Sequence, residues 1–155
     1  MTFIVIICLL FIAMIARFYW KQHTAVDFVY QDKTYRVSPH YYELAQKALQ
    51  QNDERAKYEI ITQYYESENP PIPALCFALT KELAEQEKDL GALTELGDLY
   101  YDGVGTPKDE EKGKAVYARA LELYDNPPPG LYIPENSKDY RNFLLERSQL
   151  REIKK

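Results

Sequence analysis

The chain has 155 residues, which is enough for one domain to bury a core without disulfides or a structural metal. Its 19 basic and 24 acidic residues give a formal charge of -5 at pH 7, so no basic surface for nucleic acid is expected. The two cysteines, Cys8 and Cys76, lie in separate segments, which excludes a disulfide framework and cysteine pairs at metal-ligand spacing. The 14 tyrosines are unusual, and such side chains fill helix-packing seams or line recognition surfaces.

The amino-terminal segment is strongly apolar, because residues 3–16 contain no polar side chain over 14 positions. Counted over residues 1–20, the segment reaches the roughly 20 residues that a helix needs to cross a bilayer. An arginine that can extend toward headgroups and an aromatic belt follow the apolar run. The segment predicts a single transmembrane anchor with the membrane-interface residues Arg17, Phe18, Tyr19 and Trp20. The alternatives are a buried core helix and a cleaved secretory signal, although a basic leader and a small-residue cleavage site are missing.

Positive charges near the predicted anchor indicate its orientation. Arg17, Lys21, Lys33 and Arg36 follow the apolar run, whereas only the terminal amine precedes it. The positive-inside rule therefore favours a cytoplasmic location for the rest of the chain, with the extracytoplasmic side as the alternative.

A short β-hairpin is expected in the juxtamembrane segment, residues 21–38. From Ala25 to Val37, apolar or aromatic residues alternate with polar ones around a turn at residues 31–33. Two strands alone are marginally stable, so the hairpin needs a neighbouring helix. It is interpreted as a spacer packed on the first helix, with a docking edge as the alternative.

Residues 39–155 carry six helical patterns separated by turn and proline signals. Ser38 is placed to cap the first helix, Pro39 is tolerated at its first position, and Asn52 or Asp53 caps the second. The expected helices span about residues 39–50, 54–67, 74–87, 90–101, 107–124 and 137–153. The expected packing faces of the first two helices comprise Tyr42, Ala45 and Leu49, and then Tyr58, Ile61, Tyr64 and Tyr65. The triple proline at residues 127–129 forces an extended loop before the last helix.

The most informative stretch is residues 96–121, which reads as a helical hairpin specified at both ends. In its first helix Leu96 and Tyr100 lie four residues apart on one face. Gly97 has no Cβ, so we expect a neighbouring helix to approach closely there.

The second half of this stretch turns the chain and begins another helix. Gly103 and Gly105 supply the backbone conformations of a sharp turn. Thr106 is expected to cap the next helix, with Pro107 at its first position and Asp109 three residues after the cap. The packing face of this second helix is expected to contain Gly113, Tyr117 and Ala120.

These residues resemble the Sel-one-like repeat, a relative of the tetratricopeptide repeat. Its pattern is Leu-Gly-x-x-Tyr-x-x-Gly-x-Gly-x-x-x-Asp, followed by small, Tyr and Ala positions. The match covers Leu96, Gly97, Tyr100, Gly103, Gly105, Asp109, Tyr117 and Ala120, with Gly113 where the family usually has alanine and Thr106 in place of the usual valine. The clearest repeat spans residues 92–121, and the match upstream of it is partial.

The resemblance implies a right-handed stack of helix pairs that offers a concave face to other proteins. The expected fold class is mainly α. It comprises an αα-hairpin repeat domain of the tetratricopeptide type over residues 39–155, with a short N-terminal β-hairpin and a preceding transmembrane helix at residues 1–20. The atypical first, second and last helices are interpreted as caps that enclose one full repeat.

No residue pattern indicates catalysis, a metal or a cofactor. His23 and His40 have no second ligand at suitable spacing, and Cys76 lies among apolar residues where a thiol behaves as a small hydrophobe. The acidic run 109–111 complements the dipole of a helix amino terminus. Residues 103–105 lack the third glycine and the lysine of a phosphate-binding loop.

The leading functional hypothesis is a non-catalytic, membrane-anchored adaptor or accessory subunit of a membrane complex. Its expected partners are proteins, without nucleic acid or a small-molecule substrate, and the partner-binding candidates are the tyrosines Tyr101 and Tyr124. Two alternatives stay open. One is a small inhibitor or immunity protein that blocks a toxin or enzyme, and the other is a structural subunit held through its transmembrane helix.

Overall fold

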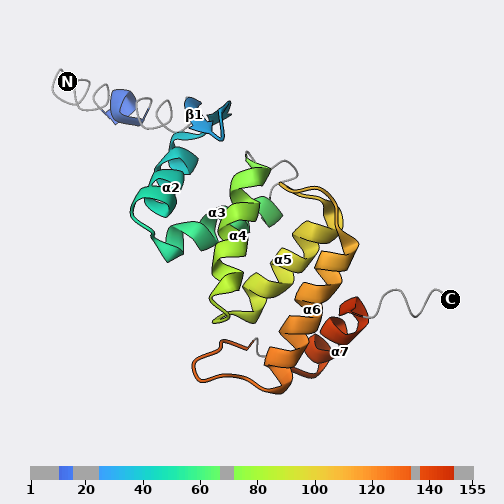
Figure 1. The fold of residues 1–155 in the computed structure, drawn as a ribbon. Coiled ribbons are helices and arrows are strands. Elements are labelled where there is room, and N and C mark those ends of the chain that lie inside the picture. The colour runs from blue at the N-terminus through green and yellow to red at the C-terminus, as the bar shows by residue number, and fades with distance from the viewer. Residues whose placement is uncertain (1–10, 16–24, 67–71, 134–136, 149–155) are drawn as a thin grey trace. The chain divides into compact units, whose positions relative to one another are not determined.

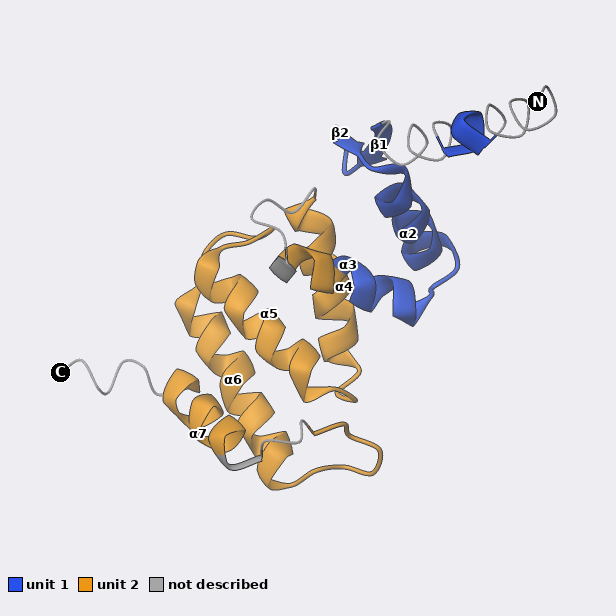
Figure 2. Cartoon of the chain, turned by 180° about the vertical axis from the view of Figure 1, so that it is seen from behind, with its two compact units in different colours: residues 1–60 blue, residues 61–155 orange. Residues whose placement is uncertain are grey.

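A computed structural model describes residues 11–15, 25–66, 72–133 and 137–148. These residues are mainly helical and contain one two-stranded antiparallel sheet (Figure 1). The chain divides into two compact units, unit 1 (residues 1–60) and unit 2 (residues 61–155), which Figure 2 colours separately. The boundary falls inside helix α3 (Glu54–Glu66), so this helix contributes residues to both units.

The sheet of unit 1 is a hairpin of β1 (Val26–Tyr30) and β2 (Lys33–Val37). The strands are antiparallel, with Val26 opposite Val37 and Tyr30 opposite Lys33. Gln31 and Asp32 connect them with φ angles of 47° and 61°. Two successive left-handed residues match the twist of the flanking strands, which makes this a tight two-residue turn.

One face of the hairpin is apolar and covered, as the alternating sequence pattern predicts. Phe28 and Val37 lie on this face and are 4% and 2% exposed. The ring of Phe28 packs edge-to-face against Tyr42 of the following helix, with ring centroids 5.8 Å apart. The hairpin therefore leans on its neighbouring helix, as a two-stranded sheet must.

Helix α2 (Pro39–Gln50) begins as predicted, because the Ser38 hydroxyl accepts a hydrogen bond from the Tyr41 backbone N–H at 3.1 Å. Of its predicted packing face, Ala45 is buried as expected, whereas Tyr42 and Leu49 are 37% and 46% exposed. The buried residues are Tyr41, Leu44, Ala45 and Ala48. Both sets have helical spacing and differ by about one residue of rotation, so tertiary packing selects between them.

Helix α3 begins after Asp53, whose carboxylate accepts a hydrogen bond from the Ala56 backbone N–H at 3.1 Å. Ile60 and Ile61 are each 1% exposed, so they supply the apolar contacts of this helix. Tyr58, which was expected on the packing face, is 36% exposed instead.

Unit 2 also contains a series of four helices, each packed against the next. They are α4 (Pro73–Glu85), α5 (Leu90–Asp102), α6 (Glu110–Asp125) and α7 (Ser137–Ser148). Figure 1 shows α5 and α6 running alongside each other, with α7 against α6. The innermost side chains come from all four helices and include Leu75, Leu90, Leu99, Tyr117 and Leu144.

The turn between α5 and α6 differs in detail from the prediction. Helix α5 ends at Gly103, which is left-handed with φ of 72°. Asp109, and not Thr106, caps α6, because its carboxylate accepts a hydrogen bond from the Lys112 backbone N–H at 3.0 Å. A carboxylate accepts this bond more strongly than a hydroxyl and also faces the positive end of the helix dipole, so the helix begins three residues later than predicted.

The proline-rich connection between α6 and α7 folds back on the molecule. The Tyr132 backbone N–H donates to the Lys88 carbonyl at 2.9 Å, and the Leu90 N–H donates to the Tyr132 carbonyl at 3.4 Å. Asp89 and Tyr132 thereby form an isolated parallel bridge. The expected extended loop is thus pinned to the turn that precedes α5.

The predicted transmembrane anchor requires a correction. In residues 11–15, 25–66, 72–133 and 137–148, no helix combines the length and apolar character needed to cross a membrane. Residues 11–15 are helical. The finding contradicts the transmembrane part of the expected fold class and the single-pass membrane localisation. The rest of the predicted anchor lies outside the described residues.

Gly105 provides a test of the α5–α6 turn. It has φ of 67°, and an added Cβ would collide with the Pro73 carbonyl group, whereas Gly130 has φ of 85° and free space around it. Gly105→Ala should lower the free energy of unfolding by about 2–4 kcal/mol, because strain and overlap add, and Gly130→Ala by about 1 kcal/mol. Urea titration followed by circular dichroism measures both values. Equal losses would show that the contact with Pro73 does not constrain the turn.

Candidate functional site

The α5–α6 hairpin is held by two reciprocal contacts between glycine and tyrosine. A Cβ added to Gly97 would lie 2.7 Å from the Tyr117 ring, and one added to Gly113 would lie 2.6 Å from the Tyr101 ring. Each glycine therefore makes room for an aromatic ring of the opposite helix. Tyr117 is 0% exposed, and its hydroxyl donates to the Asp98 carboxylate at 2.6 Å. Burial and then this bond raise the pKa of Tyr117, so the hydroxyl keeps its proton.

The other residues of the repeat-like motif lie at packing and turn positions. Leu96 and Ala120 are 5% and 0% exposed. The half-buried Tyr100 packs edge-to-face on Phe77 of α4, with ring centroids 5.3 Å apart. Gly103, Gly105 and Asp109 form the turn described above. These positions are structural and hold α4, α5 and α6 together.

The two partner-binding candidates are not open anchors. Tyr101 is half-buried, and its hydroxyl donates to the backbone carbonyl of Arg147 in α7 at 3.2 Å. Tyr124 is also half-buried, with its ring 6.2 Å from that of Tyr140 in α7. Both residues thus pack against α7, a helix whose return to this face could not be predicted from local periodicity. The membrane-interface candidates Arg17, Phe18, Tyr19 and Trp20 lie outside the described residues.

A polar stripe runs along α5. Gly91, Glu95, Asp98 and Asp102 recur at helical spacing on one side, and all four are half-exposed or exposed. The fully buried residues of α5 are Leu90, Ala92, Leu93, Thr94, Leu96, Gly97 and Leu99. We call Glu95, Asp98 and Asp102 the acidic stripe.

Tyrosines of two other helices border the acidic stripe within unit 2. From α7, the Tyr140 hydroxyl donates a hydrogen bond to the Leu90 carbonyl at 3.0 Å. The pKa of Tyr140 is raised by burial and then by nearby carboxylates that include Glu95. From α3, the pKa of Tyr64 is raised by burial, then by Cys76 and then by Asp102. Tyr64 is therefore influenced by Asp102, and Tyr140 by Glu95 and Asp98.

Glu95 has the most perturbed carboxyl group of the stripe. Burial, followed by the negative charges of Asp89 and Asp98, raises the pKa of Glu95 from 4.5 to about 7. Across the part of the chain that the structure describes, no hydrogen bond or ion pair reaches its carboxylate. Near neutral pH this group is therefore a partly desolvated acid whose charge lacks compensation from the described residues.

A cation lies at the middle of the same stripe. Arg147 of α7 places one guanidinium nitrogen 3.7 Å from the Asp98 carboxylate. Its guanidinium carbon is 5.9 Å from the ring centroids of Tyr101 and Tyr117 and 5.6 Å from that of Phe143. Three aromatic rings and a carboxylate together form a site suited to a cation.

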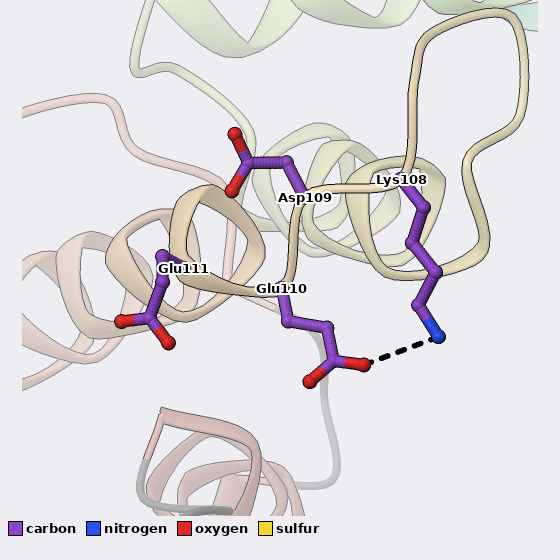
Figure 3. A pocket seen from close by; sticks show the side chains of 4 residues that line it. All are labelled: Lys108, Asp109, Glu110 and Glu111. Carbon is purple, nitrogen blue, oxygen red and sulfur yellow. Dashed lines mark ion pairs between the residues drawn. The ribbon is translucent and has the colours of Figure 1, made fainter.

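A hollow lies on the surface at the acidic amino terminus of α6. Its lining residues are Lys108, Asp109, Glu110 and Glu111 (Figure 3). The Lys108 ammonium pairs with Glu110 at 3.1 Å. In Figure 3 the side chains of Asp109 and Glu111 point in different directions, away from a common centre. The run therefore serves the helix terminus and does not converge on a ligand.

The remaining chemical candidates do not assemble. Burial raises the pKa of the Cys76 thiol to about 11, so it is protonated at neutral pH and poorly nucleophilic. A ring nitrogen of His40 lies 2.9 Å from the Glu59 carboxylate, and both side chains are exposed. Within the described ranges, His, Cys, Asp and Glu side chains form no group of three or more that could hold a metal ion.

The acidic stripe and Arg147 were not identified from the sequence. The spacing of Glu95, Asp98 and Asp102 was a visible signal, since it equals that of the apolar positions used to predict the helix. Arg147 gave no such signal, because Asp98, Tyr101 and Tyr117 lie 30 or more positions away from it in the chain.

Comparison with known proteins does not add a relative to this picture. No protein-family model, curated protein or solved structure matches the chain.

Tyr101 can be tested as a packing residue. Tyr101→Ala should lower the free energy of unfolding by about 2 kcal/mol, and Tyr101→Phe by about 1 kcal/mol through loss of the hydrogen bond to Arg147. Tyr132→Ala is the matched control, because that side chain is 62% exposed and should change stability by less than about 0.5 kcal/mol. Denaturant unfolding measures all three, and a neutral Tyr101→Ala would restore an exposed role for this residue.

Glu95 should make stability depend on pH. Because its pKa is raised from 4.5 to about 7 in the folded chain, the unfolded carboxyl ionises first as pH rises, and stability is lost between about pH 4.5 and 7. Glu95→Gln removes this loss. Relative to wild type, the variant should gain about 1–2 kcal/mol between pH 5 and pH 8, a value reduced for partial contact with water. Urea midpoints measured at both pH values test this, and a constant difference would contradict it.

Proposed function

We propose that unit 2 is a non-catalytic protein-interaction module that resembles the Sel-one-like repeat and binds a basic segment of a partner protein along the acidic stripe of α5. The resemblance is supported by the positions of its motif residues. Gly97 and Gly113 allow the close helix contacts that such a hairpin needs, and Gly103 and Gly105 turn the chain.

The observation that carries this proposal is the uncompensated charge of Glu95. A partly buried carboxylate beside the like charges of Asp89 and Asp98 destabilises the folded chain at neutral pH. A lysine or arginine of a partner would offset that cost, because it replaces repulsion with attraction at the same position. Ionisable groups with strongly shifted pKa values on an accessible surface are typical of binding sites.

Two further features favour a basic protein segment as the ligand. The net charge of -5 attracts cations over a distance and raises association rates at low salt. Tyr64 and Tyr140 border the stripe from α3 and α7, and tyrosine supplies contact area with one polar end. An extended segment with basic residues on one side would meet carboxylates and aromatic rings together.

Direct binding tests the proposal. The probe is a fluorescein-labelled peptide of alternating arginine and serine, and the same peptide with glutamate in place of arginine is the specificity control. The variant Glu95→Gln with Asp102→Asn should weaken binding of the basic peptide by about fivefold or more in fluorescence anisotropy. Binding should also weaken as salt is added.

The matched protein control removes the same charge elsewhere on unit 2. Glu82→Gln with Glu111→Gln changes exposed residues of α4 and α6 and should alter affinity by less than about twofold. Equal weakening by the two double variants would mean that net charge alone attracts the peptide. No measurable binding by the wild-type chain would reject the stripe as a site for basic segments.

A further inference from the structure

Arg147 is bound by aromatic rings and a carboxylate, the groups that bind a cationic ligand. Its guanidinium lies over Tyr101, Tyr117 and Phe143 at 5.6–5.9 Å from their ring centroids and 3.7 Å from Asp98. Aromatic faces and a carboxylate attract cations by the same electrostatics whether the cation belongs to the chain or to a partner. The Arg147 and Asp98 side chains are 38% and 32% exposed, so this ion pair is in contact with solvent, whereas the Tyr117 ring is fully buried.

Helix α7 delivers Arg147 and is attached mainly by polar and aromatic contacts. Among its described side chains only Leu144 is fully buried, whereas α4 buries six residues. Its other contacts include hydrogen bonds of Tyr140 and Tyr101 and an exposed ion pair of Arg141 with Asp125. The rings of Phe143 and Tyr140 also pack against Tyr117 and Tyr124 of α6. A helix with few fully buried side chains is one that can open locally while the rest of its unit stays folded.

Asp98 connects Arg147 to the proposed binding surface. It is the central residue of the acidic stripe and is already engaged by Arg147 and by the Tyr117 hydroxyl. A basic partner that spans Glu95, Asp98 and Asp102 must therefore share or displace the guanidinium of Arg147. The attraction of Asp98 for a cation of the partner is thus partly satisfied by Arg147 of the same chain.

We propose that Arg147 is an internal ligand, and that α7 competes with a basic partner segment for the cation site formed by Asp98, Tyr101 and Tyr117. The inference rests on the proposed function and adds its regulation. In the free chain α7 occupies the site and lowers the affinity of the stripe. Partner binding shifts the equilibrium toward a state in which the carboxyl end of α7 is displaced.

Arg147→Gln tests this competition with the same arginine-serine peptide. Removal of the internal ligand should tighten peptide binding about fivefold, since more of the free chain is then competent to bind. Arg141→Gln is the control, because it removes an equal charge from the same helix. The Arg141 guanidinium donates hydrogen bonds to Asp125 and lies outside the cation site. This variant should leave affinity within about 1.5-fold.

A second variant guards against a folding defect. If circular dichroism shows that Arg147→Gln loses helix, Tyr101→Phe replaces it, because this change keeps the ring and the charge but removes the hydrogen bond to the Arg147 carbonyl. It should also tighten binding. Hydrogen exchange of wild-type residues 137–148 should increase when peptide is added, because α7 is displaced.

The outcomes separate this inference from the proposed function. Equal tightening by the Arg147 and Arg141 variants would show general repulsion between cations and overturn the competition. Wild-type affinity in the Arg147 or Tyr101 variant, or slower exchange of α7 on binding, would overturn it as well and leave the acidic stripe as a binding site. Absence of peptide binding in every protein would overturn both.

Discussion

The ring of Tyr117 is the contact on which the packing of unit 2 depends. It lies in the space left by Gly97, is fully buried, and contacts the rings of Tyr101 and Phe143 at 5.8 and 5.7 Å. One side chain of α6 thereby joins α5 to α7. Each aromatic pair contributes about 0.5–1.5 kcal/mol beyond the area that it buries, so several such pairs are a substantial part of the stability of a small unit.

The same tyrosine links packing to electrostatics. Its hydroxyl binds Asp98, which orients that carboxylate beside Arg147 and near Glu95. The buried hydroxyl of Tyr117 donates a hydrogen bond to Asp98, whereas the described surroundings of Glu95 offer no comparable donor. Neighbouring carboxylates on one helix thus have different environments, and burial together with like charges raises the pKa of Glu95. This contrast makes the surface of α5 more informative about function than its total charge.

The structure places the predicted binding residues differently from the sequence-based expectation. The sequence predicts Tyr101 and Tyr124 as partner-binding residues of a membrane-anchored chain. Both tyrosines pack against α7, and the described helices include none that could span a bilayer. The chemistry available for binding lies instead in carboxylates bordered by tyrosine rings. The proposed basic partner would be selected by charge at this surface, and its binding would displace the carboxyl end of α7.

The sequence by itself determined the local elements, because their signals come from neighbouring residues. Ser38 and Pro39 mark a helix start, Gly103 marks a helix end, and the alternation from Ala25 to Val37 marks a hairpin. The sequence could not decide between two capping residues or two packing faces that were locally equivalent. Asp109 and Thr106 could both cap a helix, and two stripes of α2 had the same spacing, so only tertiary contacts separated them.

Tertiary structure alone decided which residues share a surface. Arg147 meets Asp98 and Tyr101 because α7 folds back along α6, and the proline-rich loop returns to Lys88 through backbone hydrogen bonds. Neither event has a periodic signature, since each depends on long-range packing between segments far apart in the chain. The sequence therefore determined the helices and the turn of the repeat-like hairpin, whereas the position of α7 decided which tyrosines are covered and which carboxylates stay open.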